Sequence, residues 1–173
     1  MADYDYIIAG GGTAGCILAN RLTENGKFRV LLLEAGGEAR SMWISIPAGF
    51  SKLLVDPNFN WRFQTEPEDN VHGRVIAVPR GKGLGGSTLI NGMIYVRGIP
   101  QDYDGWADAG ATGWGWDQVE PAFRRLEHYD AGGPTRGKHG PMWLEAVAER
   151  YPVSDAFLQA ALQDGQPLNP DYN

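Results

Sequence analysis

A short glycine-rich segment near the N-terminus constrains the fold of this chain more than any other feature. It lies between an apolar run at 6–9 and a segment that carries Ile17, Leu18 and Leu22 at helical spacing. The predicted order is therefore strand, tight turn and helix. The glycine-rich segment consists of Gly10, Gly11, Gly12, Thr13, Ala14 and Gly15.

An acidic residue at a suitable distance completes the pattern. A second apolar run at 28–33 is followed by Glu34, which lies 19 positions after Gly15. A strand, a Gly-x-Gly-x-x-Gly turn, a helix and a second strand with an acid at its tip form the dinucleotide-binding βαβ fingerprint. We therefore predict an α/β fold with a Rossmann-like domain built on a parallel sheet.

The glycines and the acid have separate expected roles. Gly10 permits the turn, Gly12 lets the backbone approach a pyrophosphate, and Gly15 lets the helix lie close to the strand. The phosphates would meet free N–H groups at the helix N-terminus. Glu34 would accept hydrogen bonds from the ribose hydroxyls, and its charge would repel a 2′-phosphate, which argues against NADP. FAD and NAD remain as alternatives at this point.

Charge and hydropathy exclude several classes of function. The chain has a net charge of −6 with 15 basic residues, which argues against a nucleic-acid partner. It has no run of 18 apolar residues, so no membrane span is expected. Asp3 and Asp5 stand where a signal peptide would be positively charged, which favours the cytoplasm. Cys16 is the only cysteine, so neither a disulfide nor a CxxC metal site is possible, and we expect it to be a small buried residue.

Further elements follow the βαβ unit. Alternating and β-branched residues predict strands at 61–65 and 74–78, and a third short strand is expected at 142–144. One helix is expected to begin at an Asp117 N-cap and a last one at a Ser154 cap. Four of the six tryptophans gather in the second half of the chain, where we expect them to form core: Trp106, Trp114, Trp116 and Trp143.

A second glycine-rich segment, 81–87, leads into an apolar stretch and suggests backbone packed against something flat or phosphorylated. Residues 81–91, with Tyr95, Gly98 and Asp104 downstream, resemble the first signature of the glucose-methanol-choline (GMC) oxidoreductases. The segments GGGTAG, LLLEAG and NWRFQTEPE agree with the family in order. The resemblance covers essentially the whole chain and implies an enzyme that binds FAD and oxidises an alcohol.

The resemblance also implies a set of FAD-binding residues. It assigns 10–15 to the pyrophosphate, Glu34 and Ala35 to the adenosine ribose, and Trp61 to the flavin half. The phosphate and ribityl chain would be lined by Leu84, Gly86 and Ser87. A flat isoalloxazine ring needs close approach of the backbone along one side. The residues beside that ring would be Asn91, Gly92, Met93 and Ile94; a helix cap is the alternative role of Asn91.

Two departures from the family bear on the chemistry. Some members attach FAD through a histidine at the position of Ile90, so FAD is expected to be noncovalent here. Family members are also much longer, and their catalytic histidine lies near the far C-terminus. The C-terminal remainder of the same protein is therefore an expected partner. We do not expect a base among the histidines of this chain, His72, His128 and His139, because none has an evident partner in the sequence.

These observations predict the N-terminal part of a GMC-type oxidase or dehydrogenase. Residues 1–130 would belong to the FAD-binding domain, and 131–173 would begin the substrate-binding domain. The substrate would be a primary alcohol resembling choline, an aryl or furan alcohol, or pyridoxine, which is oxidised to an aldehyde by hydride transfer to flavin N5. The alternatives are an FAD-containing hydroxynitrile lyase of the same fold and a noncatalytic dinucleotide-binding module.

Overall fold

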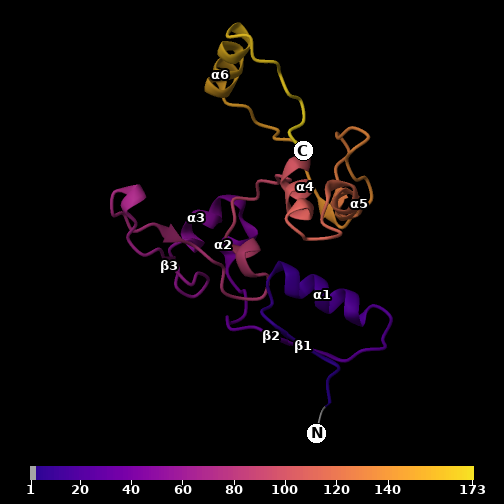
Figure 1. The fold of residues 1–173 in the computed structure, drawn as a ribbon. Helices are drawn as coiled ribbons and strands as arrows, with labels where there is room; N and C mark the ends of the chain where they lie inside the picture. The colour runs from indigo at the N-terminus through magenta and orange to yellow at the C-terminus, as the bar shows by residue number, and fades with distance from the viewer. Residues whose placement is uncertain (1–2) are drawn as a thin grey trace. The chain divides into compact units, whose positions relative to one another are not determined.

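The computed structural model describes residues 3–173, and its first elements form the expected βαβ unit. Strand β1 (Tyr6–Ala9) pairs in parallel with β2 (Val30–Leu33), with Tyr6 opposite Val30 and Ala9 opposite Leu33. Helix α1 (Thr13–Thr23) connects them and packs on the pair (Figure 1). The parallel pairing confirms the α/β fold class. Strand β2 is two residues shorter than the expected run, because pairing with β1 begins only at Val30.

The chain divides into two units, one ending at Ile94 and the other spanning Tyr95–Asn173. The first unit has a small buried apolar core, in which Leu53 and Ile90 are 1% and 4% exposed. On the strands, Ile7 and Leu33 are 66% and 51% exposed. The other elements of the first unit are short: α2 (Met42–Ser45), η1 (Pro47–Gly49), α3 (Phe50–Leu53), β3 (Phe63–Gln64), η2 (Asp69–Val71), β4 (Ala77–Val78) and η3 (Gly86–Leu89). Strands β3 and β4 pair antiparallel inside the two expected strand regions.

The second unit is mainly helical. It contains α4 (Pro100–Asp108), α5 (Trp116–Leu126), β5 (Glu127–His128), β6 (Met142–Trp143) and α6 (Pro152–Gln163), and β5 pairs in parallel with β6. Among residues 3–173, none of the helices is both long and apolar enough to cross a bilayer. The expected domain boundary after residue 130 falls inside this unit and stays a prediction.

Aromatic rings join α4 to α5. The Tyr103 ring lies 5.2 Å from Trp106, 5.6 Å from Trp116 and 5.8 Å from Phe123, measured between centroids. The expectation that the tryptophans form core is wrong, because Trp116 is only half-buried and Trp106 is 50% exposed. Two more tryptophans are also exposed: Trp114 and Trp143.

Both predicted helix caps are wrong. Helix α5 begins one residue before Asp117, and its first N–H, that of Trp116, donates to Asp104 Oδ1 at 2.9 Å. A side chain from α4 thus replaces the local cap. Helix α6 begins at Pro152, two residues before Ser154, because the fixed φ of proline suits the first helical position.

A buried ion network holds the second unit together. The Glu127 side chain is fully buried, and its Oε2 lies 2.6 Å from Arg97 Nη2 and 2.9 Å from Arg136 Nε. The Gly137 N–H donates to the same oxygen at 2.8 Å. Burial alone would raise the pKa of Glu127, but the hydrogen bonds from Arg136 and Gly137 and the charge of Arg97 lower it overall. Arg136 also binds both carboxylate oxygens of Asp171, at 2.7 and 2.8 Å.

A lysine closes the loop after β5. The Lys138 ammonium donates to the backbone carbonyls of Tyr129, Asp130 and Gly132 at 2.9, 2.8 and 2.7 Å. The loop thereby folds around a positive charge that belongs to the chain itself.

Candidate dinucleotide site

The turn after β1 has the geometry that the glycines predict. Gly10 adopts φ +98°, a left-handed conformation that favours glycine, and its N–H donates to the Leu33 carbonyl at 2.7 Å. A Cβ on Gly15 would collide with the carbonyl oxygen of Gly10. A Cβ on Gly12 would meet only the Gly86 Cα, at 3.8 Å. The absence of a side chain at Gly15 therefore allows the close contact with Gly10 within the turn. The absence of a side chain at Gly12 leaves space that a ligand could fill.

The N-terminus of α1 is available to an anion. Gly12, in extended conformation, precedes the helix and provides no side-chain cap, and the first turn contains no acidic residue. The first N–H groups of a helix have no intrahelical acceptor and carry the positive end of the helix dipole. This end of α1 therefore suits a diphosphate.

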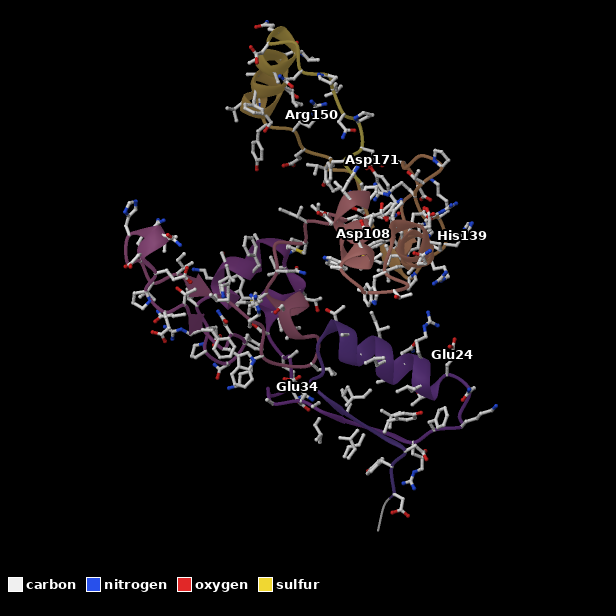
Figure 2. All side chains as sticks on the ribbon, viewed as in Figure 1. Glu24, Glu34, Asp108, His139, Arg150 and Asp171 are labelled. Atoms are coloured by element: carbon white, nitrogen blue, oxygen red, sulfur yellow. The ribbon has the colours of Figure 1, made fainter. Side chains whose placement is uncertain are left out.

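Glu34 directly follows β2 (labelled in Figure 2) and points its carboxylate at backbone N–H groups. Its Oε2 accepts from Gly11 at 2.7 Å, and its Oε1 accepts from Gly36 at 2.8 Å and from Gly83 at 3.1 Å. The hydrogen bond from Gly36 is the main reason that the pKa of Glu34 is lowered, and those from Gly11 and Gly83 act in the same direction. Glu34 is therefore ionised at neutral pH.

The second glycine-rich segment lies against the first. The Gly85 N–H donates to the Gly11 carbonyl at 2.7 Å, and Gly12 and Gly85 form an isolated parallel bridge. The Ser87 hydroxyl accepts from the Gly81 N–H at 3.1 Å. The segments 10–15 and 81–87, which are far apart in sequence, thus form one wall.

A cavity of about 780 Å³ opens beside this wall. The rings of Trp61 and Phe63 stack at 5.8 Å with 5° between their planes, and the Lys82 ammonium lies 4.9 Å from the Trp61 ring centroid. Ten of the predicted residues line the cavity: Gly10, Gly12, Thr13, Ala14, Gly15, Glu34, Ala35, Trp61, Gly86 and Ser87. The structure therefore brings together most of the residues that the resemblance assigned to the phosphates, the ribose and the flavin half.

The remaining predicted residues are not among those that line it. Gly11 donates its N–H to Glu34, and a Cβ on Gly11 would lie 2.9 Å from a methyl carbon of Leu84, so these two residues pack against each other. The segment 91–94 is exposed, and its turn is held by the Met93 N–H, which donates to Asn91 Oδ1 at 3.1 Å. The flavin contacts of Asn91, Gly92, Met93 and Ile94 stay a prediction.

Sequence reasoning missed four residues of the cavity wall, Ala9, Leu33, Phe63 and Arg80, and placed a fifth, Gly81, in the second glycine-rich segment without assigning it a contact with FAD. Ala9 and Leu33 could have been found, because they end β1 and β2 and ligands bind beyond the carboxyl ends of parallel strands. Phe63 stands two positions after Trp61 in an alternating run, which places both on one face. Arg80 had no such signal, since its position depends on the fold of the second segment.

The expectation about the histidines needs one correction. His128 lies in β5, where its ring stacks on Trp143 at 3.7 Å and its Nε2 lies 3.3 Å from Asp130 Oδ1. It therefore has the partner that the sequence did not reveal. Cys16 is only half-buried, and its thiol donates to the Gly11 carbonyl at 3.2 Å. The described residues contain no cluster of metal-ligating side chains.

Comparison with known proteins finds relatives whose names describe oxidoreductases, dehydrogenases and oxidases. A family model described as GMC oxidoreductase matches residues 4–173. The chain is 45% identical over 173 residues to an oxygen-dependent choline dehydrogenase of Photobacterium profundum, with 98% of this chain and 30% of the relative covered. Among solved structures, it resembles pyridoxine 4-oxidase from Mesorbium loti with a TM-score of 0.86 and 38% identity, over 93% of this chain and 32% of that one. It also resembles an FAD-dependent oxidoreductase from Chaetomium thermophilum with a TM-score of 0.85 and 32% identity, over 98% and 31%.

Proposed function

This chain belongs to the GMC oxidoreductase family, and we propose that it forms the FAD-binding part of an enzyme that oxidises a primary alcohol to an aldehyde. The observation that carries the proposal is the cavity on which both glycine-rich segments, Glu34 and Trp61 converge. A dinucleotide needs an anion site and a ribose acceptor close together, and this cavity offers both.

The residues of the cavity fit FAD in separate ways. The N–H groups of the first turn of α1 would hold the diphosphate, and Gly12 and Gly86 would let it approach the backbone. Glu34 Oε2 accepts one protein hydrogen bond and has a free lone pair for a ribose hydroxyl. The Trp61 and Phe63 rings offer an apolar wall. Ile90, which is buried, has no atom that could bond to a flavin, so FAD would be held without a covalent link.

When bound, FAD supplies the hydride acceptor, flavin N5. The residues of the cavity would bind and orient this cofactor. We assign none of them the role of the base that takes the hydroxyl proton of the substrate. The chain spans about 30% of the length of its choline dehydrogenase relative. We propose that the C-terminal remainder of the full-length protein contributes the base and most of the substrate pocket. A cytoplasmic location and a domain boundary near residue 130 stay predictions.

Choline is the first alcohol to test, because the relative named as a choline dehydrogenase is 45% identical and the pyridoxine 4-oxidase chain is 38% identical. The full-length protein that contains this chain should be purified and its flavin identified after acid denaturation. Its flavin absorbance is then followed without oxygen after addition of choline, pyridoxine or an aryl alcohol. We expect FAD to be present and to be bleached by one of these alcohols, with formation of the aldehyde.

The same preparation separates the two alternatives. A hydroxynitrile lyase would release cyanide from a cyanohydrin and leave its flavin oxidised with every alcohol. A noncatalytic module would bind the dinucleotide and convert neither kind of substrate. A protein without FAD would refute the proposal itself.

A further inference from the structure

We propose that Glu34 assembles the cofactor site before the cofactor arrives, by fastening the second glycine-rich segment (81–87) to the first (10–15). This positioning role rests on the proposed FAD site, but it differs from the expected contact between Glu34 and the ribose. It concerns the protein alone.

The hydrogen bonds of Glu34 reach three separate parts of the chain. Oε2 holds the Gly11 N–H, 23 positions earlier, while Oε1 holds the Gly36 N–H and the Gly83 N–H, 49 positions later. All three donors are backbone groups of loop residues. One carboxylate therefore ties the turn after β1 and the loop after β2 to the second glycine-rich segment.

Few other contacts can replace this attachment. The Gly85 N–H also reaches the first segment, through the Gly11 carbonyl at 2.7 Å. The apolar contribution is small, because Leu84, the side chain that packs against Gly11, remains 54% exposed. The second segment depends largely on hydrogen bonds, and those of Glu34 are charge-assisted and hence stronger than neutral ones.

A carboxylate suits this position better than an amide. Both oxygens of Glu34 act as acceptors, whereas glutamine has one oxygen and an NH₂ group that can only donate. In Glu34→Gln, the NH₂ group would face either the Gly11 N–H or those of Gly36 and Gly83. Part of the attachment is lost in both orientations, so this substitution is not mild, although it keeps an acceptor for the ribose.

Two ligands distinguish this role from ribose binding in the full-length protein. We would measure the affinity of wild type and Glu34→Gln for FAD and for an FAD analogue whose adenosine ribose lacks the 2′ and 3′ hydroxyls. We expect the substitution to weaken both ligands by about 10- to 100-fold. If Glu34 acts only through the ribose, the analogue binds both proteins equally, and the inference is refuted. Glu38→Gln, at an exposed residue paired with Arg40, is the matched control and should change neither affinity.

Hydrogen exchange of the FAD-free protein gives a second readout that needs no ligand. The Gly83 and Gly85 amides should exchange at least about tenfold faster in Glu34→Gln than in wild type, because both depend on the attachment. Unchanged exchange at these amides would refute the inference even where FAD binds normally. If the wild-type protein does not bind FAD, but these amides still exchange faster in Glu34→Gln than in wild type, the proposed function is refuted and the inference about Glu34 stands. Should Glu34→Gln not fold, Glu34→Asp, whose carboxylate is one methylene shorter, is measured in the same two assays with the same criteria.

Discussion

Replacing Glu127 by glutamine should destabilise the unit Tyr95–Asn173 by about 3–5 kcal/mol, the range measured when one partner of a buried ion pair is removed. The Glu127 side chain is fully buried, and the side chains of Arg97 and Arg136 are 2% and 3% exposed. Glutamine keeps the volume but removes the negative charge. Arg136 still has Asp171, whereas the described contacts leave the Arg97 guanidinium without a second carboxylate.

The magnitude follows from what surrounds the charge. Arg97 cannot turn to water, because only 5% of the residue is exposed, so the cost of its desolvation is no longer offset. An exposed pair provides the comparison. Arg40 and Glu38 lie 2.7 Å apart with side chains 83% and 72% exposed, and such pairs contribute about 0–1 kcal/mol.

The assay is hydrogen exchange of the Gly140 amide in the full-length protein. This N–H donates to the backbone carbonyl of Glu127 at 2.8 Å, a bond that the substitution does not remove. Its exchange therefore reports the free energy of opening of the surrounding structure. Glu38→Gln, at the exposed pair, is the comparison. If Glu127→Gln lowers this free energy of opening by less than about 1 kcal/mol, as Glu38→Gln should, the Arg97 charge is not effectively buried in the full-length protein and the reasoning is refuted.

Four further outcomes can be checked. Gly15→Ala should impair folding of the turn, because the new Cβ collides with Gly10, whereas Gly12→Val should fold and lose FAD. Gly37→Ala is the control and should retain flavin, because a Cβ on Gly37 meets nothing within 4 Å. Normal flavin content in Gly12→Val would contradict the site. Acid denaturation should release FAD into the supernatant, because Ile90 offers no linkage; flavin in the precipitate would disprove this. Stability contributed by Glu127 should be fully present above its unfolded pKa of about 4.3 and be lost as the pH falls through its lowered folded pKa, so urea midpoints of wild type and Glu127→Gln should converge in acid. Residues 1–173 alone should oxidise no alcohol; bleaching of their flavin by any alcohol would show that they contain the base.

The βαβ unit could be predicted from sequence because its signals are local. The turn conformation of Gly10, the close approach at Gly15 and the position of Glu34 all follow from one short pattern. The set of backbone partners of Glu34 could not be predicted: Gly36 is a local partner, but Gly83 lies 49 positions later and reaches the carboxylate only through the fold of the second glycine-rich segment. The most informative property of this side chain, its use of both oxygens within the protein, is a product of tertiary structure.

The errors in the second unit have the same physical origin. Asp117 is a good local cap, but Asp104 on another helix binds the first N–H group of α5 instead. The His128 ring stacks on Trp143, fifteen positions later, because β5 pairs with β6. Local patterns identify which groups need a partner, and the folded chain decides which partner they obtain.

The loop that surrounds the Lys138 ammonium has a consequence for its response to the medium. Three carbonyl groups converge on this cation in the way that they converge on a metal ion in many ordered loops. Here the cation is the side chain of Lys138, so the presence of the positive charge in the loop does not depend on the concentration of any free ion. Chelators leave such a loop unchanged, whereas acetylation of the amine removes the charge on which the three carbonyl groups converge.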